Sequence, residues 1–88
     1  MDDEEQEIII SEICESISKY YNSGFFECWV NGDTNFWFIF SEYINDDKKS
    51  RKMGKHLERM IYKCKKEHVP LEHVLLKTEM YITKCIFE

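Results

Sequence analysis

The chain has 88 residues, of which 43% are hydrophobic, 15% are aromatic and 33% are charged, and its formal net charge is −5. This length suits one domain with one hydrophobic core, and the apolar content excludes an intrinsically disordered chain. No uncharged stretch approaches the ~20 residues that a transmembrane helix needs, so we expect no membrane partner. The sequence therefore predicts a single acidic domain over residues 1–88.

The N-terminus and the cysteines indicate an intracellular protein. Residues 2–5 are all acidic, whereas a secretory signal begins with positive charge. No Cys-x-x-Cys pair occurs, and single cysteines in a reducing compartment behave as small buried hydrophobes with free thiols. We therefore expect a cytoplasmic protein whose four cysteines are reduced: Cys14, Cys28, Cys64 and Cys85.

The first predicted element is a helix over residues 3–21. Its apolar residues recur three and four positions apart, as one face of an amphipathic helix requires. Acidic residues fill the first turns, where the helix dipole favours them, and Gly24 provides a break after the last turn. The expected apolar face comprises Ile9, Ile10, Ile13, Cys14, Ile17, Tyr20 and Tyr21.

Residues 25–40 have the composition of a β-hairpin. Residues 25–30 and 35–40 are rich in aromatic and β-branched residues, and the Asn31-Gly32 pair between them favours the positive φ angles of a tight turn. Residues 36–40 do not alternate with polar residues, which predicts a strand that is covered on both faces. One helix does not cover so much aromatic surface, so we expect a homodimer or another partner to bury the rest.

The second half of the chain begins with a predicted helix that runs from a cap at Asn45 or Asp46 to about Glu67. Residues 71–87 fit either a helix, by apolar spacing, or a strand, by the composition of residues 80–87. We favour the strand. The sequence thus predicts an α+β fold in the order helix, β-hairpin, helix, C-terminal strand, with a C-terminal helix as the alternative.

Charge is divided sharply along the sequence. Residues 1–47 carry twelve acidic residues against one lysine, whereas residues 48–68 carry nine basic residues against two glutamates. Either cluster is also consistent with a solvated surface that binds nothing. If they act in recognition, we expect a non-enzymatic domain that binds and modulates a macromolecule, foremost a protein with a basic surface. The residues expected at this contact are Asp2, Asp3, Glu4, Glu5, Asp46 and Asp47, with Trp29 and Trp37 as aromatic anchors.

The alternative function is binding of RNA or DNA by the basic helix. Basic residues near a helix N-terminus attract phosphate, and the backbone N–H groups there add to the attraction. The residues expected to contact nucleic acid are Lys48, Lys49, Arg51, Lys52 and Lys55.

The sequence shows no motif for catalysis, for a cofactor or for a metal ion. Its three glycines are too far apart for a phosphate-binding loop, and no Gly-x-Ser-x-Gly motif occurs. Cys64, His68 and His73 have the side chains of zinc ligands, but they lack a fourth ligand and the paired spacing of such sites. We therefore expect no enzymatic activity, no cofactor and no metal.

Overall fold

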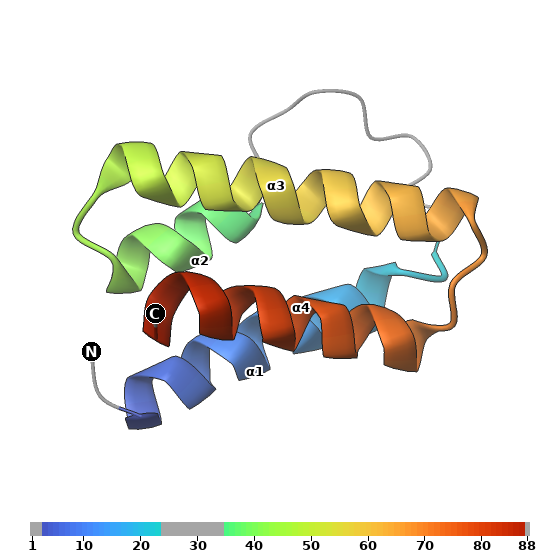
Figure 1. The fold of residues 1–88 in the computed structure, drawn as a ribbon, viewed down its shortest axis with the longest axis horizontal. Helices are drawn as coiled ribbons and strands as arrows, with labels where there is room; N and C mark the ends of the chain where they lie inside the picture. Colours follow the sequence, from blue (N-terminus) through green and yellow to red (C-terminus); the bar gives the residue numbers. More distant parts are fainter. Residues whose placement is uncertain (1–2, 24–34, 88) are drawn as a thin grey trace.

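The computed structural model describes residues 3–23 and 35–87, and all regular structure in these ranges is helical. Consecutive helices run in opposite directions (Figure 1). Both α2 and α4 pack against α1 and against α3, so α1 and α3 lie diagonally across the bundle (Figure 1). The helices are α1 (Asp3–Tyr20), α2 (Asn35–Tyr43), α3 (Asp47–Lys66) and α4 (Leu71–Phe87).

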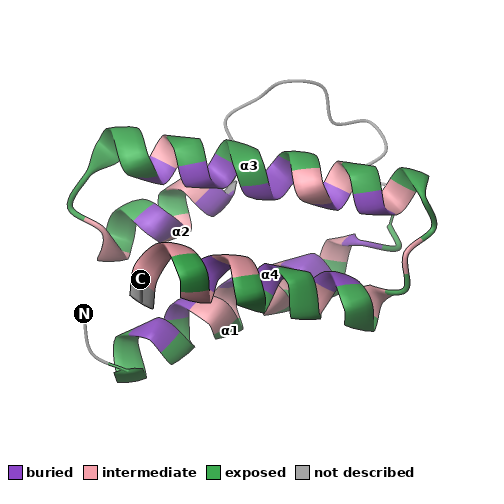
Figure 2. Ribbon diagram, viewed as in Figure 1, coloured by how far each residue is buried: buried purple, intermediate pink, exposed green. Residues whose placement is uncertain are grey.

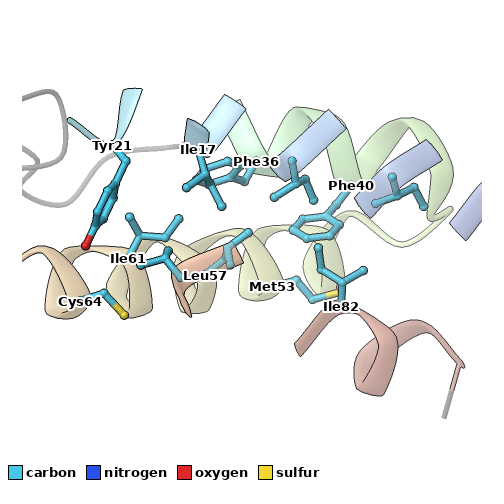
Figure 3. Close-up of a cluster of buried hydrophobic side chains, with 12 residues drawn as sticks. Ile17, Tyr21, Phe36, Phe40, Met53, Leu57, Ile61, Cys64 and Ile82 are labelled. Carbon is cyan, nitrogen blue, oxygen red and sulfur yellow. The ribbon is translucent and has the colours of Figure 1, made fainter. Parts of the chain in front are cut away.

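The core lies between the helices and receives side chains from all of them (Figures 2 and 3). Three isoleucines of α1 and the central residues of α3 are fully buried, at the positions that their spacing predicts. The two helices expected over residues 3–21 and 46–67 are therefore confirmed as α1 and α3. The buried apolar residues are Ile9, Ile13, Ile17, Tyr21, Phe36, Phe40, Met53, Leu57, Ile61, Cys64, Val74 and Ile82.

The β-hairpin prediction is wrong for its second strand, because residues 35–43 form α2. Phe36 and Phe40, four positions apart, are 2% and 0% exposed, whereas Phe38 between them is 54% exposed. A strand would place all three on one face, whereas a helix turns Phe38 away from the other two. The strand expected over residues 25–30 and the turn after it lie outside the described residues.

The C-terminal strand prediction is also wrong, because residues 71–87 form α4. Val74, Thr78 and Ile82, spaced four apart, are fully buried against the other helices. The Thr78 hydroxyl donates a hydrogen bond of 2.8 Å to the Val74 carbonyl, which satisfies its polar group inside the bundle. Packing of this face outweighs the strand composition, and the described chain is all-α rather than α+β.

The two ends of α3 are stabilised by distinct capping contacts. At the N-terminus the Asp46 carboxylate accepts a hydrogen bond of 3.0 Å from the Lys49 backbone N–H, so Asp46 is the cap residue. At the C-terminus His68 has a φ of 56°. The backbone N–H groups of His68 and Val69 donate to the carbonyls of Lys65 and Cys64, which is the Schellman arrangement.

Replacing His68 with glycine is expected to stabilise the protein by about 1 kcal/mol, since glycine adopts a positive φ without the steric cost that a Cβ brings. Urea unfolding of H68G measures this change. The matched control is H73G, which changes an exposed histidine within α4 and should cost up to about 1 kcal/mol. Loss of stability in H68G would contradict the assignment of this helix end.

Candidate functional site

The outward side of α3 presents an unbroken row of basic residues. Its positions are separated by three or four residues, so they project from one face of the helix, and each is exposed. At 1.5 Å per residue the row extends for about 27 Å. We call it the basic face; it comprises Lys48, Lys52, Lys55, Arg59, Lys63 and Lys66.

Acidic side chains of α3 lie away from the basic face. Glu58 is only 7% exposed and occupies the inward side of the helix. Asp47, in the first turn, accepts a hydrogen bond of 3.0 Å from Arg51 Nε and one of 3.2 Å from Trp37 Nε1. The positive charges of the basic face therefore follow one another with no carboxylate between them.

Aromatic rings lie beside cations at both ends of α3. The Arg51 guanidinium stacks 4.0 Å from the centre of the Trp37 ring, which brings α2 against the start of α3. The Phe38 ring lies 4.2 Å from that of Trp37. Near the other end, the Lys66 ammonium lies 4.6 Å from the centre of the Tyr62 ring. Cation–π contacts of this kind hold the cations in place; Lys66 keeps its charge available, whereas Arg51 is also ion-paired with Asp47.

The Arg51 hydrogen bond, together with that from Trp37, lowers the pKa of Asp47. A carboxylate whose pKa is lower in the folded state stabilises the fold above its unfolded pKa, and this contribution is lost as the pH falls through the folded value. We therefore expect wild-type protein to unfold at a higher temperature than D47N at pH 7, with a difference that shrinks as the pH falls below about 4. Thermal melts followed by circular dichroism test this, and a difference that widens in acid would contradict it.

The residues expected at an acidic contact surface are only partly assembled. Asp3, Glu4 and Glu5 are exposed in the first turn of α1, whereas Asp46 and Asp47 serve as the cap of α3 and as the acceptor for Arg51. Among the expected residues, Asp2 and Trp29 lie outside the described ranges, and Trp37 packs beside the basic helix instead.

Carboxylates of α1 and α2 do gather around Tyr43 at one end of the bundle. The Tyr43 hydroxyl donates a hydrogen bond of 3.3 Å to Glu12. Partial burial and the charges of Glu12, Glu42 and Glu5 raise the pKa of Tyr43. A shallow hollow at this end is lined by Glu5, Tyr43, Ile44, Lys49 and Ile86.

The residues expected to bind nucleic acid fall mostly on one side of α3. Lys48, Lys52 and Lys55 belong to the basic face, while Lys49 and Arg51 lie at its flanks. The sequence-based list ended at Lys55, so it missed the second half of the face. The signal that extends the list was present in the sequence, since the same spacing continues through Arg59, Lys63 and Lys66.

The described residues form neither a metal site nor a membrane-spanning helix. No three of their histidine, cysteine or acidic side chains gather as ligands for a metal ion, and Cys64 is buried in the core. None of the described helices combines the length and apolar character that crossing a bilayer demands. Comparison of the chain with protein-family models, curated proteins and solved structures finds no match.

Proposed function

We propose that this domain binds nucleic acid through the basic face of α3 and has no catalytic role. The observation that supports this is the placement of six cations, with no carboxylate among them, along one exposed helix face. Phosphate backbones carry closely spaced negative charge, and lysine and arginine bind them by releasing condensed counterions.

The aromatic pair beside the start of α3 suits unpaired bases. Phe38 is 54% exposed and lies next to Trp37, whose other neighbour is the Arg51 guanidinium. Proteins that bind single strands combine cations that contact the backbone with aromatic side chains that stack on bases. We therefore expect single-stranded RNA or DNA to bind more tightly than duplexes of the same length.

The net charge of −5 is compatible with this proposal because α1 and α3 lie diagonally across the bundle, although Glu5 of α1 and Lys49 of α3 line the same hollow. Neighbouring helix axes lie ~8–10 Å apart, and the axes of α1 and α3, which are diagonal, are farther apart than that over most of their length. The basic face also lies on the side of α3 opposite its buried residues, which point into the core shared with α1. Since the Debye length is ~10 Å at 0.1 M salt, repulsion from most α1 carboxylates is screened at the basic face.

The test is a titration of fluorescently labelled single-stranded and duplex oligonucleotides, RNA and DNA, at several salt concentrations. If about five cations contact phosphate, we expect the logarithm of the duplex-DNA association constant to fall with that of salt with a slope near −4.5. Affinity would then drop about 500-fold between ~50 mM and ~200 mM salt. Absence of measurable binding at ~50 mM salt would contradict the proposal.

The second candidate is recognition of a basic protein surface by the acidic end of α1. The observation that favours it is the exposure of Asp3, Glu4 and Glu5, close to the carboxylates that surround Tyr43. Such a surface steers association with a positively charged partner. Capture of a basic protein by wild type, but not by D3N/E4Q/E5Q, would support this candidate. For either function we propose a cytoplasmic location, where the thiols stay reduced.

A further inference from the structure

The outer face of α4 carries an apolar pair that the bundle does not cover. Leu76 and Met80 are 56% and 64% exposed, the highest values among the large apolar side chains of the described residues. They lie one helical turn apart, on the side of α4 opposite the buried Val74, Thr78 and Ile82. Together with Glu79, Thr83 and Lys84 they line a shallow hollow.

The residues around this pair follow the heptad spacing of a coiled-coil seam. His73, Leu76, Met80 and Thr83 are separated by three, four and three positions, as successive a and d positions are. The flanking charges are segregated by sign. Glutamates occupy both g positions, at 72 and 79, and lysines occupy both e positions, at 77 and 84. All four charged residues are exposed.

We propose that two copies of this domain associate through the outer faces of their α4 helices, with the two helices parallel. In a parallel pair, each g residue faces the e residue of the next heptad in the other helix. Glu72 then faces Lys77 of the second copy, and Glu79 faces Lys84 of the second copy. The twofold axis repeats both pairs, so the same surface complements itself in charge.

The charge pattern also distinguishes between the two possible orientations. In an antiparallel pair, g positions face g positions and e positions face e positions, which would set glutamate against glutamate and lysine against lysine. Like charges placed in this way oppose association and suppress the wrong arrangement. The charge pattern therefore favours a second copy of the domain as the partner of this face, with the two α4 helices parallel.

The dimer is expected to be weak and to depend on protein concentration. The seam spans only two heptads, and α4 is about 25 Å long, so the buried area belongs to the small, transient class of interfaces. Because the bundle already holds α4 as a rigid helix, association carries no free-energy cost for ordering this helix. We expect a dissociation constant on the order of 100 µM.

Sedimentation equilibrium from about 10 µM to about 1 mM protein tests the dimer. We expect reversible dimerisation of wild type, and at least a tenfold rise in the dissociation constant for M80E and for K77E/K84E. The control K52E/K55E makes the same charge change on α3 and should dimerise as wild type does. Circular dichroism verifies that each variant folds. A wild type that stays monomeric at about 1 mM, or an M80E variant that dimerises equally well, would overturn the proposal.

Charge exchange tests the orientation. The variant E72K/K77E/E79K/K84E should dimerise with itself, because every pair is reversed and stays complementary. In the parallel orientation it should not pair with wild type, since glutamate then faces glutamate, whereas an antiparallel mixed dimer would face glutamate with lysine. Because this exchange leaves the mass unchanged, one of the two proteins is labelled with ¹⁵N, and native mass spectrometry of an equimolar mixture then distinguishes the species. Self-association of the variant supports the parallel arrangement, and a variant that forms only mixed dimers with wild type and none with itself would overturn it. Neither experiment involves nucleic acid, so its result is independent of the function proposed for α3.

Discussion

The variant F40A is expected to lose about 3–5 kcal/mol of unfolding free energy, whereas F38A should lose less than about 1 kcal/mol. Phe40 is fully buried between helices, so its removal forfeits apolar burial and leaves a cavity. Phe38 is 54% exposed, and its truncation leaves the core intact. Urea unfolding followed by circular dichroism measures both changes.

This comparison distinguishes the helix α2 from a β-strand over the same residues. In a strand Phe38 and Phe40 would share a face, and the two truncations would have similar effects. A small domain has only about 0.05–0.15 kcal/mol of stability per residue, so F40A is close to the limit of folding. The milder F40L, with an expected cost near 1.5 kcal/mol, preserves the comparison if F40A does not fold. Equal losses in the Phe38 and Phe40 variants would contradict the helix.

Charge reversal in the middle of the basic face is expected to abolish nucleic-acid binding. The variant K52E/K55E/R59E replaces three adjacent phosphate contacts with repulsion, and we expect at least a 100-fold loss of affinity at about 50 mM salt. All three side chains are exposed, so the fold should be unaffected. Fluorescence anisotropy with labelled oligonucleotides measures the affinity, and circular dichroism confirms the helical content.

Single variants separate the basic face from the general effect of net charge. K55E should make the logarithmic salt slope shallower by about one, because one phosphate contact is lost. K19E makes the same change on the exposed part of α1, across the bundle, and should leave that slope unchanged. Equal effects of K19E and K55E would show that binding follows net charge rather than the basic face.

The sequence predicts α1 and α3 well because their apolar and charged residues alternate with helical spacing. Residues 36–40 are all apolar, so they show neither the spacing of an amphipathic helix nor the alternation of a strand. The burial of Phe36 and Phe40 between helices therefore decides their structure. In α4 the exposed Leu76 and Met80 interrupt the amphipathic pattern, so the helical spacing is weak. The strand-like composition of residues 80–87 therefore led to the wrong prediction.

The candidate site, like the fold, was predictable from the sequence only in part. The basic cluster is visible in the sequence, and its positions on α3 follow directly from helical spacing. The contact of Trp37 with Arg51 and Asp47 was not predictable from the expected hairpin, because it requires α2 to be a helix packed beside α3. The same contact gives Asp47 an internal role, which its place in an acidic stretch does not reveal.

The most direct test of nucleic-acid binding by α3 is NMR mapping of backbone amide shifts on addition of a single-stranded oligonucleotide. We expect the largest changes along residues 48–66, with further changes at Trp37 and Phe38, and little change in the first turn of α1. Changes confined to residues 3–7, or a spectrum that stays the same at saturating oligonucleotide, would contradict the proposed interface.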